Sequence, residues 1–471
     1  MRSSDSVRLA DELPLRAELL SAAQMERYGK QLAQTHELKR VATPDRLLKR
    51  LAENETALVR ACNLLIAAAS ANRRIGPSGE WLLDNFYLIE EQIRTARRHL
   101  PAGYSEQLPQ LQSGPSAGLP RVYDIALAAI SHGDGRVDGE SLGGFIAAYQ
   151  SVTPLTLGEL WAIPIMLRLA LIENLRRVGM HIAAGRIERD LAESWADRMI
   201  ATVERDPNSL ILVIADMARS NPPMGGPFVA ELARRLQGRS SSLALPLTWI
   251  EQSLSESGLT IEQLVHAENQ QQATDQVSVS NSIGSLRFLG TLDWRGFVER
   301  VSLVEQTLLE DPSGVYAKQD FATRDRYRHT IEALAKQSSL SENDIARKAV
   351  QLARRDQAQD APEALSRHVG FYIIDAGREQ LERAVGATLS VVERLRRACS
   401  RAPLAVFLGA IAAGTLAYAA FVTMQAYLHD ASPALVVLFA LLSLLAGSQL
   451  AVSLVNLLAT VLTIPRLLPR M

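Results

Sequence analysis

Residues 403–464 read PLAVFLGAIAAGTLAYAAFVTMQAYL (403–428), HDASP (429–433) and ALVVLFALLSLLAGSQLAVSLVNLLATVLTI (434–464). Only Asp430 carries a formal charge in this span, although 21% of the whole chain is charged. Each apolar half is longer than the ~20 residues that a helix needs to cross about 30 Å of hydrocarbon. We therefore predict a transmembrane hairpin with helices at 403–429 and 433–464. The alternative is a hairpin buried in a soluble core, but soluble helices keep a polar face that these halves lack.

The arginines that flank the two apolar segments predict their orientation. Arg394, Arg396, Arg397 and Arg401 precede the first segment, and Arg466 and Arg470 follow the second. The connecting turn contains neither Lys nor Arg. Because positive charge stays on the cytoplasmic side, we expect both termini to be cytoplasmic and the turn to lie outside. The first 20 residues contain no apolar run of signal-peptide length, so the region before residue 403 is expected to be cytoplasmic too.

The overall composition argues against several kinds of partner and cofactor. The 50 Lys and Arg residues nearly balance the 51 Asp and Glu residues, whereas nucleic-acid-binding domains are usually basic. The two cysteines are too few for a disulfide framework, and the eight histidines include no His-x-x-x-His pair. No Asp-x-Asp pair occurs either. We therefore expect no nucleic-acid partner, no metal site and no cofactor in this chain.

The region before the membrane segments is predicted to be almost entirely helical, so the expected fold class is all-α. Within 78–100, apolar residues recur at three- and four-residue spacing, which is typical of a helix packed on a core. Thr156 and Glu159 have the spacing of a capping box at the start of another helix. The expected order is an N-terminal extension (1–48, partly disordered or helical), a first helical subdomain (49–112), a helical body (113–402), the hairpin and a cytoplasmic tail (465–471).

Three segments of the helical region have a less certain pattern. The block 157–179 is strongly apolar, but charged residues interrupt it, so a buried core helix kinked at Pro164 is favoured over a third membrane span. The polar stretch 269–282 fits a helix or a short strand, and periodicity does not decide between them. Residues 378–401 are predicted to form a last amphipathic helix that is continuous, or nearly so, with the first membrane helix.

The densest polar cluster before the membrane is QDFATRDRYRH at 319–329. Its charged residues are Asp320, Arg324, Asp325, Arg326, Arg328 and His329. Arginine forks bind phosphate and carboxylate in a two-pronged way, so the cluster fits an anion-binding site. It also fits an internal network of ion pairs between helices, and that interpretation is favoured. No residue is assigned a catalytic role.

The segment HGDGRVDGESL at 132–142 has some features of a calcium-binding loop. Asp134, Asp138 and Gly139 stand at acceptable positions, but Arg136 occupies a ligand position and Phe145 replaces the closing carboxylate. The pattern therefore argues against calcium binding.

Two patterns within the membrane segments predict contacts with other helices. Gly409, Ala413 and Ala417, with Ala410 and Gly414 alongside, form a ridge of small residues that allows a neighbouring helix to approach closely. A polar seam runs down the second segment and consists of Gln449, Ser453, Asn456 and Thr460. This seam fits a path for a polar substrate or hydrogen bonding between helices, and helix association is favoured.

Several segments resemble the N-terminal region of the bacterial cyclic beta-1,2-glucan synthases. They are EWLLDNFYLIEEQIRTARRHLPAGYSEQLPQL (80–111), DGRVDGESL (134–142), LGELWAIPIMLRLALIENLRR (157–177), NSIGSLRFLGTLDWRGFVE (281–299), GVYAKQDFATRDRYRHTIEALA (314–335) and HVGFYIIDAGR (368–378). The resemblance runs from about Lys49 to the last residue. It implies a multi-pass protein of the bacterial inner membrane, with a helical cytoplasmic region and two transmembrane helices. In the complete family members, a glycosyltransferase domain that uses UDP-glucose and a divalent metal follows, and the product is a periplasmic glucan.

This chain departs from the family pattern because its sequence stops about where the glycosyltransferase domain should begin. None of the family's catalytic residues has a matching position, so the chain alone is expected not to be catalytic. The first hypothesis is a membrane-anchoring scaffold part of a synthase, as a truncated frame, a split gene or a fragment. Its expected partners are the lipid bilayer and the remaining synthase domains or transmembrane helices. The alternative is a stand-alone, membrane-anchored helical regulatory or interaction protein.

Overall fold

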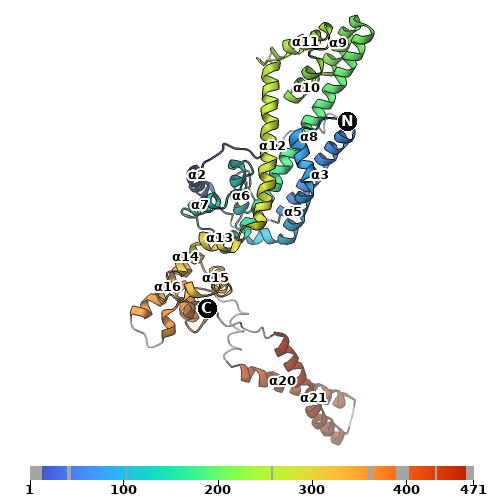
Figure 1. The fold of residues 1–471 in the computed structure, drawn as a ribbon. Helices are drawn as coiled ribbons and strands as arrows, with labels where there is room; N and C mark the ends of the chain where they lie inside the picture. The colour runs from blue at the N-terminus through green and yellow to red at the C-terminus, as the bar shows by residue number, and fades with distance from the viewer. Residues whose placement is uncertain are drawn as a thin grey trace. The chain divides into compact units, whose positions relative to one another are not determined.

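The computed structural model describes residues 13–39, 44–101, 103–255, 258–358, 364–388, 402–429 and 432–462. Within these ranges the chain is helical and contains no β-strand beyond two isolated bridges, which confirms the all-α prediction. The fold divides into two units, residues 1–303 and residues 304–471. Figure 1 shows the order of the helices along the chain.

The first unit is built around the long helix α8 (Leu157–Arg205). Helices α3 (Leu47–Ser70), α5 (Phe86–His99), α6 (Arg121–His132) and α12 (Ile261–Thr291) all pack on it. Every residue from 165 to 175 of α8 is buried, because neighbours surround this half of the helix. The apolar block 157–179 is therefore a core helix, and Pro164 lies inside a helix that continues to Arg205.

Smaller helices complete the first unit. Helix α2 (Ala22–Thr35) packs on α7 (Gly139–Gln150), and α4 (Gly76–Asp84) packs on α12. The short α13 (Trp294–Val301) contacts α7 and α8. Helices on both sides of residue 112, including α3 and α8, contribute side chains to one hydrophobic core.

A second hydrophobic core lies at the other end of α8. It is formed by the C-terminal half of α8 together with α9 (Leu210–Ser220), α10 (Gly226–Leu236) and α11 (Ala244–Ser255). Helix α12 extends alongside both cores (Figure 1). The ambiguous stretch 269–282 belongs to α12. It is helical because Ser278 and Ser282, one turn apart, both face Asn174 of α8.

The second unit has its own core of short helices. These are α14 (Leu303–Leu308), α15 (Phe321–Ala335), α16 (Glu342–Ala358), α17 (Val369–Ile374) and α18 (Arg378–Val385). Helix α18 ends at Gly386, whose φ of 65° is left-handed, a conformation that glycine adopts readily at the end of a helix. The prediction of one helix over 378–401 is therefore wrong at this point, and residues 389–401 lie outside the described ranges.

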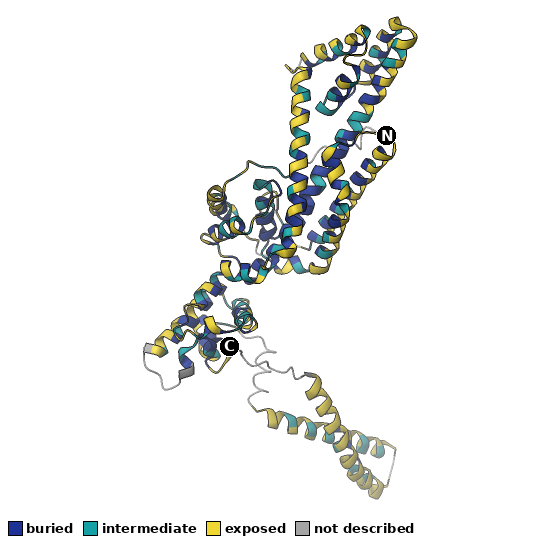
Figure 2. Cartoon of the chain, in the orientation of Figure 1, coloured by how far each residue is buried: buried dark blue, intermediate teal, exposed yellow. Residues whose placement is uncertain are grey.

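The hairpin consists of α20 (Pro403–Leu428) and α21 (Pro433–Leu462), which pack against each other. Both are long and apolar enough to cross a membrane. Their apolar side chains are mostly exposed, in contrast to those of the helical cores (Figure 2). Only Ala419 is buried in α20, so the structure gives no support to a hairpin hidden in a soluble core. Asp430 and the flanking arginines used to predict orientation lie outside the described residues.

Candidate functional site

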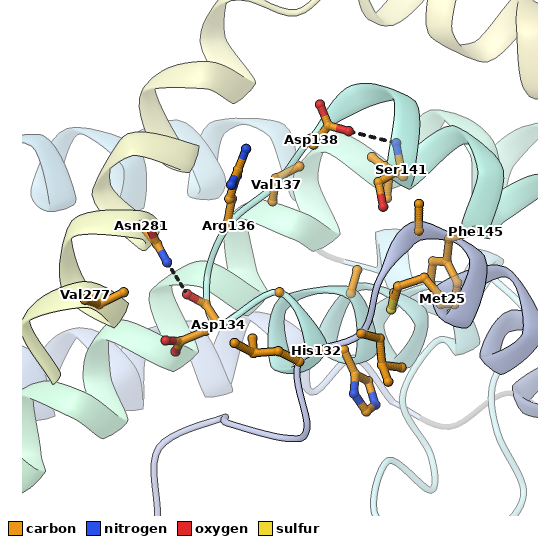
Figure 3. Close-up of a pocket in the computed structure, with 16 residues that line it drawn as sticks. Met25, His132, Asp134, Arg136, Val137, Asp138, Ser141, Phe145, Val277 and Asn281 are labelled. Atoms are coloured by element: carbon orange, nitrogen blue, oxygen red, sulfur yellow. Dashed lines mark hydrogen bonds between the residues drawn. The ribbon is translucent and has the colours of Figure 1, made fainter. Parts of the chain in front are cut away.

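A pocket of about 440 Å³ lies in the first unit, between α2, α12 and the loop that joins α6 to α7 (Figure 3). The joining loop is the segment considered above as a calcium loop. Gly135 has a φ of 79°, and a side chain there would collide with the Ser282 hydroxyl of α12. Glycine is therefore needed where this loop approaches α12. The side chain of Asp138 accepts a hydrogen bond from the Ser141 backbone N–H at 2.9 Å, so it caps α7.

The polar groups around this pocket have different partners. The Asp134 carboxylate accepts a bond from Arg16 Nε at 3.3 Å, and Asn281 Nδ2 donates to the Asp134 carbonyl at 3.1 Å. His132 Nδ1 lies 2.7 Å from the Glu18 carbonyl oxygen. Arg136 is exposed; its backbone N–H donates to the Gly133 carbonyl at 3.0 Å, and its guanidinium makes no hydrogen bond or ion pair within the described part of the chain. Sequence reasoning noticed the loop but missed the pocket, because its other walls lie more than 100 residues away in the sequence.

The predicted arginine cluster in the second unit surrounds a carboxylate that the sequence analysis did not single out, Glu305 of α14. Arg324 Nη1 and Arg328 Nη1 each lie 2.8 Å from a Glu305 oxygen, and the Tyr316 hydroxyl donates to the same carboxylate at 2.7 Å. The side chains of Glu305 and Arg328 are almost completely buried. These two arginines are thus engaged in an internal ion-pair network.

The other members of the cluster are less buried. Asp320 caps α15 by accepting from the Thr323 backbone N–H at 2.9 Å. Asp325 lies 3.2 Å from Arg328 Nη2 and 3.4 Å from His329 Nε2. Arg326 is exposed. The structure therefore brings Arg324, Asp325, Arg328 and His329 into one chain of contacts, and uses Asp320 as a helix cap.

A second polar network of the same unit centres on Asp311. Its carboxylate accepts from Ser313 Oγ at 2.6 Å and from the Val369 backbone N–H at 3.0 Å, and lies 2.8 Å from His368 Nδ1. Burial alone would raise the pKa of Asp311, but the bonds from His368 and Ser313 lower it to about 2. His368 Nε2 lies 3.2 Å from the Tyr327 hydroxyl. The network connects α15 to the loop before it and to α17.

The first unit contains a similar buried carboxylate, Glu173 of α8. Arg50 Nη2 lies 2.7 Å, Arg177 Nε 2.9 Å and Arg176 Nη2 3.0 Å from Glu173 Oε1, and Asn54 Nδ2 donates to Oε2 at 2.8 Å. Burial acts to raise the pKa of Glu173, but the surrounding arginines and Asn54 lower it to about 2. The buried carboxylates Glu173 and Glu305 are therefore both neutralised by arginines of their own unit.

The polar seam of α21 faces away from α20. Gln449, Ser453, Asn456 and Thr460 are all exposed. At about 100° per residue, they lie on the opposite side of the helix from Gly447 and Ala451. Those two residues meet α20, because a Cβ added at Gly447 would be 2.8 Å from Tyr418, and Ala451 Cβ is 3.3 Å from the Cβ position of Gly414.

The small-residue ridge of α20 also points away from its partner helix. Gly409, Ala413 and Ala417 are exposed, and no atom lies within 4 Å of a Cβ placed at Gly409. Gly414, which was predicted to lie alongside this ridge, faces α21 instead. The hairpin thus uses one set of small residues for its own packing and leaves the ridge and the seam on its two outer faces.

Comparison with known proteins gives the family relation. No family model matches the chain. The chain is 33% identical over 348 residues to the cyclic beta-(1,2)-glucan synthase NdvB of Rhizobium meliloti, and the match covers 73% of this chain and 12% of that protein. The chain therefore corresponds to a small part of its relative's length. By this similarity, it is related to the cyclic beta-(1,2)-glucan synthase family over about three quarters of its own length.

Proposed function

We propose that this chain is the membrane-anchoring, non-catalytic scaffold part of a cyclic beta-1,2-glucan synthase. Its helical units would hold or regulate the glycosyltransferase, and its hairpin would supply two helices to a larger transmembrane bundle. The similarity to NdvB supports the glucan-synthesis context. The internal neutralisation of Glu173 and Glu305 supports a structural role for the buried charges.

The observation that carries this proposal is the outward direction of the polar seam on α21. Gln449 and Asn456 carry amide groups that are exposed on a helix apolar enough to span a membrane. An amide facing lipid has no water to bond with, so another transmembrane helix is its natural partner. The small-residue ridge on α20 offers a second surface for close helix packing. Both surfaces need partners beyond the hairpin itself.

The proposal also specifies location and partners. The chain would lie in the bacterial inner membrane as a multi-pass protein with both termini in the cytoplasm. Its partners would be the lipid bilayer and the remaining synthase domains or transmembrane helices, with no nucleic acid. UDP-glucose and a divalent metal would be bound by the glycosyltransferase domain and not by this chain.

A chimera tests the scaffold role. The segment of the R. meliloti synthase that matches this chain is replaced by it, and cyclic glucan is measured in cells that lack their own synthase. We expect the chimera to make glucan, and the double variant Gln449→Leu/Asn456→Leu to reduce the yield at least several-fold. The reason is that leucine removes the hydrogen bonds between helices but still inserts into the membrane. Purified alone, the chain should transfer no glucose from UDP-glucose.

The matched control is Ser448→Leu, which also replaces a polar residue of α21 by leucine. Ser448 lies about 100° around the helix from Gln449, and its hydroxyl already bonds to the Leu445 carbonyl at 2.8 Å. This variant should keep normal glucan yield. Equal yields from the seam variant and the control, with equal amounts of protein in the membrane, would contradict the proposed docking. Glucose transfer by the purified chain would contradict the non-catalytic role.

A further inference from the structure

The scaffold role makes no use of the 440 Å³ pocket in the first unit. Its volume lies within the usual range for small-molecule sites. The walls come from three separate parts of the chain: the start of α2, the loop before α7 and the middle of α12. The pocket is therefore formed by the packing of several helices and one loop, and not by a single loop.

One side of the pocket is apolar. Leu20, Met25, Leu142 and Phe145 contribute to it, and Val277 of α12 closes the edge. Met25, Leu142 and Phe145 are themselves buried in the hydrophobic core, so this surface is held in place. Figure 3 shows Met25 and Phe145 on the α2–α7 side, and Val277 and Asn281 on the other.

The polar rim offers both hydrogen-bond donors and acceptors, with little unbalanced charge. The Arg136 guanidinium has no partner within the described residues and is free to donate. Asp138 uses one carboxylate oxygen to cap α7, and its exposed side chain can accept a further bond. The Ser141 hydroxyl can do either. The Asp134 carboxylate is already paired with Arg16.

This combination selects an uncharged, hydroxyl-rich ligand. A strong anion would be attracted by Arg136 but repelled by the carboxylates of Asp134 and Asp138. A cation would be attracted by the two carboxylates but repelled by Arg136. A sugar has hydroxyl groups that donate and accept around its edge and C–H groups on its faces, which match the rim and the apolar wall. A mostly apolar lining with a few well-placed polar groups is the usual composition of a small-molecule site.

We propose that this pocket binds a neutral gluco-oligosaccharide. The linkage of the sugar is the one part of this inference that rests on the proposed function, because a protein of cyclic beta-1,2-glucan synthesis would be exposed to β-1,2-linked glucose chains. Arg136 and Asp138 would bond to the hydroxyl groups, and the Met25–Leu142–Phe145 surface would contact one face of a sugar ring. A scaffold with such a site senses the product of the enzyme that it holds.

The test is isothermal titration of the purified full-length chain in detergent with the β-1,2-linked glucose disaccharide and trisaccharide. We expect saturable binding, with Arg136→Ala weakening it at least tenfold. Ser141→Phe should abolish binding by filling the cavity. The control is Arg239→Ala, which removes another exposed loop arginine far from the pocket in sequence and should bind as the unmodified chain does. Circular dichroism melting confirms that each variant is folded.

Several outcomes would overturn the proposal. One is the absence of binding to either sugar by the unmodified chain. Another is binding that Arg136→Ala and Ser141→Phe leave unchanged, because the ligand would then lie elsewhere. Tighter binding of UDP-glucose than of the oligosaccharides, lost in the same variants, would make the pocket a nucleotide site. None of these results depends on the hairpin, so the chimera experiment can succeed or fail independently.

Discussion

At the scale of single residues, the carboxylates buried among arginines are expected to contribute most to the stability of the fold. Glu173 is fully buried and contacts three guanidinium groups, and Glu305 contacts two. Removing one partner of such a buried pair is costly, because the remaining charge is left uncompensated in a medium that solvates it poorly. These contacts therefore tie α3 to α8 in the first unit, and α14 to α15 in the second.

The pH dependence of stability tests the Glu173 network. The pKa of Glu173 is lowered from 4.5 to about 2 on folding, so its charge stabilises the folded state at pH values above 4.5. This contribution is lost as the pH falls from 4.5 to 2. We expect the stability advantage of the unmodified chain over Glu173→Gln to shrink by about 3 kcal/mol across this window.

The measurement is denaturant unfolding followed by tryptophan fluorescence. All five tryptophans lie before residue 304, so the signal reports the first unit. Glu53→Gln changes an exposed glutamate and should have the pH profile of the unmodified chain. A Glu173→Gln profile parallel to that of the unmodified chain, with a constant difference down to pH 2, would show that the network does not hold the carboxylate charged.

At the scale of secondary-structure elements, the hairpin has an inner and an outer set of small residues. Gly414 and Gly447 face the partner helix, where each allows close approach. Gly409 has open space beside it. A larger residue at an inner position must separate the helices, whereas the same change at the outer position leaves the hairpin intact.

Cysteine crosslinking tests this arrangement. In a chain in which Cys62 and Cys399 are replaced by Ala, we introduce Gly414→Cys and Ala451→Cys, whose Cβ positions are 3.3 Å apart, close to the separation found in disulfides. With a protease site inserted in the connecting turn, the oxidised fragments should stay joined on a non-reducing gel. Adding Gly447→Leu should reduce the joined fraction several-fold, and adding Gly409→Leu should not. The reverse ranking would mean that the inner and outer faces are exchanged.

At the scale of the whole molecule, the placement of charge around the hairpin predicts its orientation in the membrane. Green fluorescent protein fused before Leu404 or after Met471 should be fluorescent. Alkaline phosphatase fused at the same two positions should be inactive. A fusion at Asp430 should behave in the opposite way, because the turn is the segment without positive charge. An active phosphatase at either of the two ends would refute cytoplasmic termini.

The sequence alone determined the helical class and the two apolar helices of the hairpin. Both are local properties: periodicity along 78–100 specifies helical structure, although the predicted single helix is divided at Asn85 into α4 and α5. The nearly uncharged length of 403–464 specifies segments able to span a membrane. The capping box of Thr156 and Glu159 is equally local, and it forms as predicted.

Only the tertiary structure decided which side chains meet. It brought Glu305 to Arg324 and Arg328, made a helix of the ambiguous stretch 269–282, and ended α18 at Gly386. It also joined parts of α2, the loop before α7 and α12 into one pocket, and turned the polar seam away from α20. The physical reason is that burial and pairing depend on neighbours distant in sequence, which periodicity and spacing along one chain do not record.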